Sequence, residues 1–224
     1  VPILVGCSAV SSQLVLELIE QVADLSVAAA VVTPPYYYGT NDQAALGYHF
    51  RLIAERSPLP IVIYNIPQTT HSMLAPETMA ALGELPNIIA VKDSCADLAH
   101  FRRLLELRPY PEFSIFQGSE VPMLDSLVLG ADGLVPGSGN LAPRWLVNLY
   151  EAAKAGDLDT ARLYQERVNA YRAGCYTGGY WLTALKGAAG MLGLCSERCT
   201  APLPALTPEH RQRVQDTLQK LGLL

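Results

Sequence analysis

The feature that most constrains the fold is an alternation of short apolar runs with longer segments in which apolar residues recur at helical spacing. Six runs rich in apolar and β-branched residues lie at 2–6, 28–33, 60–64, 88–92, 113–117 and 133–136. Helical spacing is clearest at 12–23, 43–55 and 98–107. Because strand-helix-strand units connect through crossovers, the alternation predicts a parallel sheet that is buried on both faces.

The alternation stops near residue 141, and only helical segments follow, at 144–155, 158–173, 180–194 and 208–221. Thr207 and Pro208 predict the start of the last helix, because threonine is a good N-cap and proline suits the first helical position. We therefore expect an α/β fold, a TIM (β/α)8 barrel over 1–156 with a C-terminal helical extension over 157–224 packed on it. A complete barrel takes about 250 residues, so we expect this chain to contain strands three to eight and to lack the first two β/α units.

Composition excludes several classes of partner. The net charge is −5 and the basic residues are scattered, so we expect no nucleic-acid partner. No apolar run approaches the roughly 20 residues of a membrane span, and the N-terminus lacks the basic start of a signal peptide. Five cysteines spread over 224 residues favour reduced thiols over a disulfide framework, which predicts a cytoplasmic protein.

The sequence also predicts neither a metal nor an organic cofactor. Cys195 and Cys199 lie on either side of Glu197, but no histidine or further cysteine nearby completes a tetrahedral set. The four histidines, among them His71 and His100, have no metal-ligand spacing. The "GSGN" stretch at 137–140 lacks the spacing of a phosphate-binding loop and is better explained as a tight turn that opens a helix.

One apolar run ends on an amine and a carboxylate, in "VKDS" at 91–94. The carboxyl ends of parallel strands carry the chemistry in barrels and doubly wound sheets, and Lys92 lies at such an end. Apolar surroundings disfavour an ammonium ion, so a neutral amine could attack a ketone and form a Schiff base. The alternative is a structural lysine that pairs with Asp93 or with a loop carbonyl.

The preceding strand also ends on a polar side chain, in "PIVIYNIP" at 60–67. Tyr64 is expected at the same edge of the sheet, followed by a turn at Asn65 and Pro67. A phenol beside an imine-forming amine can transfer protons while the carbinolamine forms and dehydrates and while a C–C bond breaks. Alternatively, Tyr64 is a packed aromatic residue with a satisfied hydroxyl.

A third strand end carries phenols, in "TPPYYYG" at 33–39. Three consecutive tyrosines could equally form an interface patch. The motifs "TPPYY", "YNIP", "VKDS" and "GADGLVPGSGN", in this order, resemble the dihydrodipicolinate synthase and N-acetylneuraminate lyase family of class I aldolases. The resemblance extends through "GNLAPRWLVNLYEAAKAGD" and "APLPALTPE" and covers essentially the whole chain. It implies a TIM barrel with a C-terminal helical bundle.

The resemblance also implies roles for three residues as catalytic groups. Lys92 would form an imine with pyruvate or with the pyruvoyl end of a 2-keto acid, without any cofactor. Tyr64 would transfer protons. Tyr37 resembles the tyrosine that enters a neighbouring subunit's site across a tight dimer interface, within a homotetramer built as a dimer of dimers. The substrates would be a small 2-keto acid and an aldehyde.

Three further residues are candidates for substrate binding. Thr69 stands where dihydrodipicolinate synthases usually carry an arginine suited to a second carboxylate, and a hydroxyl cannot form that bidentate clamp. Val135 falls where the family places backbone beside the bound keto acid. Gly118 directly follows the predicted strand 113–117. His71 stands where the family commonly has glycine, and we expect it to be an exposed loop residue.

These departures bear on the substrate. Thr69 and "VKDS" favour an aldolase of 2-keto-3-deoxy sugar acids, which yields pyruvate and an aldehyde. Dihydrodipicolinate synthesis from pyruvate and aspartate semialdehyde ranks second, and sialic acid cleavage ranks third. An alternative from another class is a noncatalytic oligomerising relative that retains the lysine.

Overall fold

The computed structural model describes residues 1–224, and its contacts divide the chain into two compact units, Val1–Val135 and Pro136–Leu224. The division precedes the boundary at 156/157 that the sequence analysis placed, so the helix Pro143–Ala155 belongs to the second unit. No helix combines the length and the apolar character that crossing a membrane requires. All five cysteines are free thiols.

The first unit is built on one sheet of six parallel strands that lie side by side in sequence order. The strands are β1 Leu4–Gly6, β2 Ala29–Val32, β3 Ile61–Asn65, β4 Ile88–Asp93, β5 Ser114–Gln117 and β6 Gly133–Leu134. Each lies within one residue of, or inside, a predicted run, and all five pairings are parallel. The predicted parallel α/β architecture is therefore confirmed.

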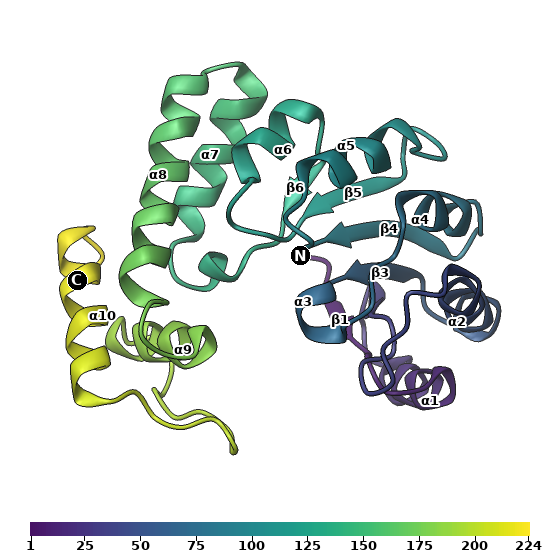
Figure 1. Cartoon of the computed structure of the whole chain (residues 1–224), viewed down its shortest axis with the longest axis horizontal. Helices are drawn as coiled ribbons and strands as arrows, with labels where there is room; N and C mark the ends of the chain where they lie inside the picture. The colour runs from purple at the N-terminus through teal and green to yellow at the C-terminus, as the bar shows by residue number, and fades with distance from the viewer. The chain divides into compact units, whose positions relative to one another are not determined.

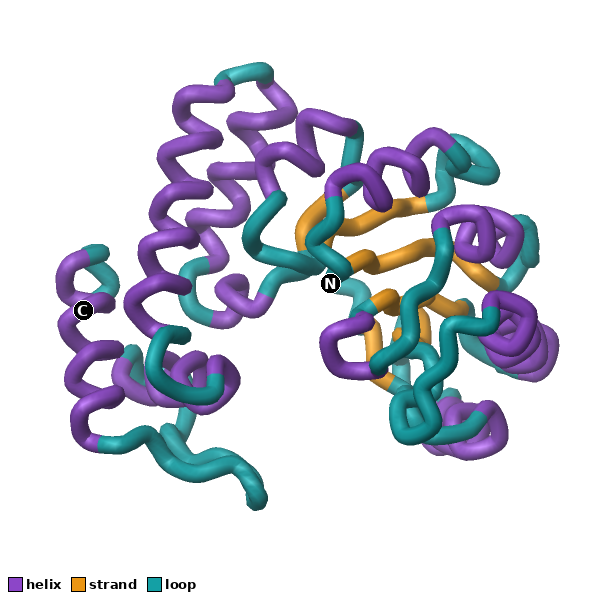
Figure 2. Tube along the Cα trace, in the orientation of Figure 1, coloured by secondary structure: helices purple, strands orange, loops and turns teal.

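Helices follow the strands, and all of them except the short α3, which lies at the end of β3, are arranged around the outside of the row of strands in the first unit (Figures 1 and 2). They are α1 Ser12–Val22, α2 Gln43–Arg56, α3 Pro67–Thr70, α4 Pro76–Gly83, α5 Leu98–Glu106 and α6 Met123–Leu129. Side-chain oxygens of Ser11, Asp42 and Asp97 cap α1, α2 and α5 by accepting hydrogen bonds from backbone N–H groups of the first turn. Such caps explain why these helices begin where they do.

The two faces of the sheet differ in what covers them. Ile61, Ile63 and Ile115 are fully buried. They lie on the face of the sheet that the helices cover, because side chains point alternately to the two faces along a strand. On the opposite face, Val62 and Ala90 pack in a small cluster with Ala29, Val31 and Phe116. The pairing of β3 with β4 shifts by one residue after Ile61 and Ile88. As a result Val62 pairs with Ala90, and Tyr64 pairs with Lys92 on the same face of the sheet.

The second unit consists of helices. It contains the single 3₁₀ turn η1 Gly137–Asn140 and the helices α7 Pro143–Ala155, α8 Leu158–Cys175, α9 Trp181–Met191 and α10 Pro208–Lys220. Gly156 ends α7 at a φ of 79°, which suits glycine, and α8 follows at once and packs against α7. Thr207 caps α10 with Pro208 in its first turn, as predicted.

Candidate active site

Lys92 and Tyr64 meet on one face of the sheet at the carboxyl ends of β4 and β3. They are direct partners in the strand register, and both side chains are half-buried. The Lys92 Nζ lies 4.0 Å from the centroid of the Tyr64 ring. Strand alternation places both side chains on the face of Val62 and Ala90, away from the helices. The structure therefore brings together the amine and the phenol that the sequence predicted.

Gly118 lies directly against this pair. A Cβ at position 118 would stand 2.6 Å from Lys92 Cε and 2.1 Å from Ser94 Oγ, so only glycine leaves room for both side chains. The Gly118 N–H donates to the Asp93 carbonyl at 2.7 Å, which fixes the approach of the two strand ends.

Ser94 is a residue that the sequence analysis did not single out. Its hydroxyl is buried and has no hydrogen-bond partner. It stands two residues after Lys92, so the period of two along an extended chain could have placed it on the same face. A buried hydroxyl without a partner beside an amine is a candidate contact for substrate, because leaving it unpaired is costly.

Asp93 faces the other way, which contradicts the alternative that it pairs with Lys92. Its carboxylate accepts a 2.7 Å hydrogen bond from Asn65 Nδ2 and a 3.0 Å bond from the Cys95 thiol. Asn65 is also not a turn residue: it is the buried last residue of β3, and its side-chain oxygen accepts from the Leu74 N–H. Adjacent residues of a strand point to opposite faces, so the run ends on an amine toward one side and a carboxylate toward the other.

On the side of β4 opposite the Lys92 side chain, burial has the largest effect on the pKa values of Asp93 and Cys95. It raises the pKa of the Asp93 carboxyl, while the hydrogen bonds from Cys95 and Asn65 act in the opposite direction. Burial also raises the pKa of the Cys95 thiol, and the neighbouring carboxylate adds to that increase. Cys95 is therefore a protonated hydrogen-bond donor rather than a reactive thiolate.

Thr69 is exposed on α3, and its hydroxyl donates to the Ile66 carbonyl at 3.2 Å within the same turn. No contact joins it to Lys92. His71 follows α3 in the left-handed region, with a φ of 55°, and is exposed as predicted. That backbone conformation favours glycine, which is a physical reason why other members of the family commonly have glycine where this chain has His71.

Tyr37 lies on the loop between β2 and α2 and is 73% exposed. Its ring packs edge-to-face on Tyr38, and no contact joins it to Lys92 or Tyr64 within the chain. Val135 follows β6, and its N–H donates to the Gln117 carbonyl at 2.9 Å, so its backbone lies beside the strand end that leads into Gly118. The chain thus assembles Lys92, Tyr64, Gly118 and Ser94, with the backbone of Val135 on the neighbouring strand.

Parallel α/β enzymes place their active sites at the carboxyl ends of the strands, and the Lys92 amine and the Tyr64 phenol lie at two such adjacent ends. The model of the dihydrodipicolinate synthetase family matches residues 1–221. The chain belongs to this family and is a lyase of the Schiff-base-forming type.

Individual relatives agree with this assignment. An uncharacterized DapA-like lyase of Halobacterium salinarum is 33% identical over 224 residues, which is 100% of this chain and 72% of that protein. Dihydrodipicolinate synthase from Bacteroides thetaiotaomicron superposes with a TM-score of 0.92 at 34% identity, covering 98% of this chain and 75% of that one. YagE, a prophage protein from E. coli K12 solved in complex with pyruvate, superposes with a TM-score of 0.92 at 28% identity, covering 100% and 76%.

Proposed function

We propose that Lys92 forms the Schiff base and that the protein is a pyruvate-dependent aldolase. The observation that carries the proposal is the 4.0 Å approach of Lys92 Nζ to the Tyr64 ring, at paired positions of two strand ends. The amine lies on the half-buried face of the sheet, beside an unpartnered Ser94 hydroxyl. These groups supply a nucleophile, a proton-transfer group and a polar contact within one small region.

The chemistry needs no metal or organic cofactor. The Lys92 amine attacks the keto carbon, and loss of water from the carbinolamine gives the imine. The substrate hydroxyl on C4 then loses its proton, and the C3–C4 bond breaks to release the aldehyde. The electron pair of that bond forms the C2–C3 double bond of the enamine, while the protonated imine becomes a neutral amine. Tyr64 transfers protons during dehydration and cleavage. Return of a proton to the enamine and hydrolysis of the imine release pyruvate and restore the amine.

The preferred substrate class is a 2-keto-3-deoxy sugar acid. This preference rests on the segment 66–71 around α3, which contains no arginine. Thr69 there offers an exposed hydroxyl instead of a guanidinium group. A second carboxylate, as in aspartate semialdehyde, would lack the bidentate partner that arginine provides. Dihydrodipicolinate synthesis remains the second candidate, because the similar structure from Bacteroides thetaiotaomicron bears that name.

The proposal extends to the assembly. Six parallel strands in sequence order, with helices outside them, fit a (β/α)8 barrel, and the resemblance to the family assigns them to strands three to eight. Tyr37 acts in a neighbouring subunit's site, because its 73% exposure leaves the phenol free for such a contact. The assembly is a homotetramer built as a dimer of dimers.

The imine is tested by incubating the protein with pyruvate and sodium borohydride and measuring the intact mass. We expect one reduced pyruvate adduct in the parent protein and none in Lys92→Ala. The control Lys186→Ala, which removes the half-buried lysine of α9 in the second unit, should keep the adduct. Absence of the adduct from folded parent protein would favour a noncatalytic relative, and an adduct retained by Lys92→Ala would assign the imine to another lysine.

The substrate class is tested by two assays on the same preparation. One follows pyruvate release from 2-keto-3-deoxygluconate, and the other follows pyruvate consumption with aspartate semialdehyde. We expect a higher kcat/KM for cleavage of the sugar acid, and we expect Thr69→Arg to shift the ratio of the two kcat/KM values toward aspartate semialdehyde. A higher kcat/KM with aspartate semialdehyde in the parent protein would support the synthase instead.

A further inference from the structure

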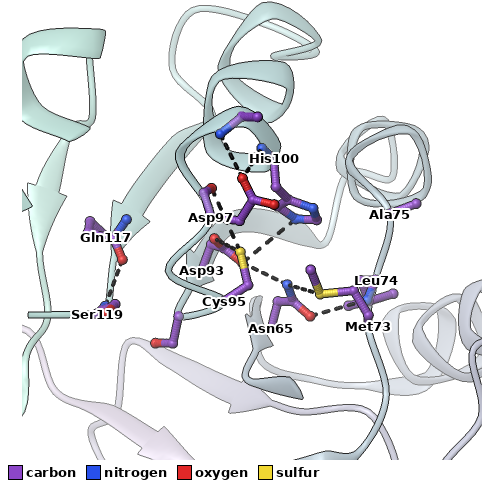
Figure 3. A network of polar contacts seen from close by, with 12 residues as sticks. Asn65, Met73, Leu74, Ala75, Asp93, Cys95, Asp97, His100, Gln117 and Ser119 are labelled. Atoms are coloured by element: carbon purple, nitrogen blue, oxygen red, sulfur yellow. Dashed lines mark hydrogen bonds and ion pairs between the residues drawn. The ribbon is translucent and has the colours of Figure 1, made fainter. Parts of the chain in front are cut away.

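Behind the strand that carries Lys92 lies a compact cluster of three potential metal ligands. Asp93 ends β4, Cys95 follows in the loop, and His100 stands in the first turn of α5 (Figure 3). One carboxylate oxygen, the thiol sulfur and one imidazole nitrogen all lie within 4.8 Å of one another. The cluster is on the helix-facing side of the sheet, opposite the Lys92 side chain, and has no part in the proposed aldol chemistry.

The imidazole in this cluster lacks a hydrogen-bond partner. His100 Nε2 is buried and has no hydrogen-bond partner, and it lies 3.9 Å from Asp93 Oδ1. The His100 side chain is 9% exposed and that of Asp93 is fully buried. Leaving a buried polar atom unpaired has a free-energy cost, so an unpaired nitrogen directed toward a carboxylate and a thiol points to a ligand that all three share.

We propose that Asp93, Cys95 and His100 bind one divalent transition-metal ion, with zinc as the best match. Thiolate, imidazole and carboxylate are all donor types that zinc accepts, and soft sulfur excludes magnesium and calcium as natural occupants. Tetrahedral zinc places neighbouring ligand atoms about 3.3 to 3.6 Å apart. The present separations of 3.0 Å from Cys95 Sγ to Asp93 Oδ2 and 3.9 Å from His100 Nε2 to Asp93 Oδ1 are close to that spacing.

The surroundings already orient these ligands. Asn65 Nδ2 donates to Asp93 Oδ1 at 2.7 Å, which is the kind of outer hydrogen bond that holds a metal-binding carboxylate in place. Asp97 caps α5 by accepting from the backbone N–H of His100 at 3.2 Å, which fixes the turn that carries the imidazole. Cys95 and His100 are each partly exposed as whole residues, although the imidazole Nε2 itself is buried.

The sequence hid this site because its ligands are of three types. Asp93, Cys95 and His100 form a short D-x-C-x4-H segment, which matches none of the common zinc-ligand spacings. Binding would replace the 3.0 Å hydrogen bond from the Cys95 thiol to Asp93, because the thiol must lose its proton to solvent before sulfur can coordinate.

The probes are Zn²⁺ and Co²⁺ added to the full chain after treatment with a chelator. Zinc stoichiometry and affinity are measured by competition with a chromogenic chelator, and cobalt binding by its absorption spectrum. The variants are Cys95→Ser and His100→Gln, which change donor atoms with little change in volume. Cys199→Ser is the matched control, because Cys199 is also a half-buried free thiol and lies in the second unit.

We expect one zinc ion per chain in the parent protein and in the Cys199→Ser variant, with at least a tenfold loss of affinity in the other two variants. Cobalt should show a thiolate charge-transfer band that Cys95→Ser abolishes. Three results would each overturn the proposal: no stoichiometric zinc on folded parent protein, unchanged zinc affinity in Cys95→Ser and His100→Gln, or a cobalt spectrum without the sulfur band. None of these readouts depends on the imine chemistry of Lys92.

Discussion

Replacing Gly118 with alanine should slow imine formation by displacing Lys92. The new Cβ would lie 2.6 Å from Lys92 Cε, which is 0.8 Å short of the 3.4 Å at which ordinary contact begins. It would also lie 2.1 Å from Ser94 Oγ, and the backbone at 118 is held by the hydrogen bond to the Asp93 carbonyl. The side chains of Lys92 and Ser94 must therefore move, because that hydrogen bond holds the backbone at position 118 in place.

The size of the effect follows from that displacement. A misplacement of about 1 Å between reacting groups costs about 100-fold in rate, which is about 3 kcal/mol of activation free energy. Overpacking of this kind lowers the free energy of unfolding by about 1–3 kcal/mol, so the variant should remain folded if the parent has ordinary stability. We therefore expect the rate of imine formation to fall about 100-fold in a folded protein.

The assay is the time course of the borohydride-trapped pyruvate adduct, with chemical denaturation run in parallel. Gly47→Ala is the control, because Gly47 lies inside α2 and the nearest atom to a new Cβ is 4.0 Å away. That variant should keep the parent rate and gain about 1 kcal/mol of stability from the better helix former. A parent-like rate in folded Gly118→Ala would refute the reasoning that this glycine makes room for the reactive lysine.

Three further perturbations test the fold. Burial lowers the pKa of His49 from 6.5 to about 4, so the unfolded chain binds the proton more tightly than the folded chain does. The free energy of unfolding should therefore fall by about 3 kcal/mol as the pH falls from 6.5 to 4. Urea titrations should show a smaller fall in His49→Gln. Thr207→Ala removes the cap of α10 and should cost about 1 kcal/mol in guanidinium unfolding, unless that helix contributes nothing to the transition. Asn87→Ala removes an amide donor that lies 3.1 Å from each of three carbonyls, at Ala54, Ser57 and Leu59. The thermal midpoint should fall by an amount equivalent to about 1–3 kcal/mol of unfolding free energy. An unchanged midpoint would show that water replaces the amide.

The His49 case shows how the neutral form is held. Its Nε2 lies 3.2 Å from the Thr33 carbonyl, which can only accept, so Nε2 carries the proton. Its Nδ1 then accepts from the Ser12 hydroxyl at 2.8 Å. The imidazole thereby joins α1, the end of β2 and α2 while it is uncharged. Burial opposes its protonation and lowers its pKa, while the hydrogen bond to the Thr33 carbonyl acts in the opposite direction.

Much of the fold could be predicted because the pattern of apolar residues is local. All six strands follow from short apolar runs, and the start of α10 follows from Thr207 and Pro208. The same pattern placed Lys92 and Tyr64 at strand ends. The roles of Tyr37 and Thr69 stay predictions, because each faces solvent in a single chain and makes only local contacts.

The sequence by itself determined the order of strands and helices, and with it the edge of the sheet at which the reactive groups gather, because hydrophobic periodicity and capping act over a few residues. Only the tertiary structure decided which way each side chain at that edge points. The register between β3 and β4 sets Lys92 over Tyr64 and turns Asp93 away toward Cys95 and His100. A shift of one residue would exchange those faces, and such a shift depends on contacts between strands far apart in the chain.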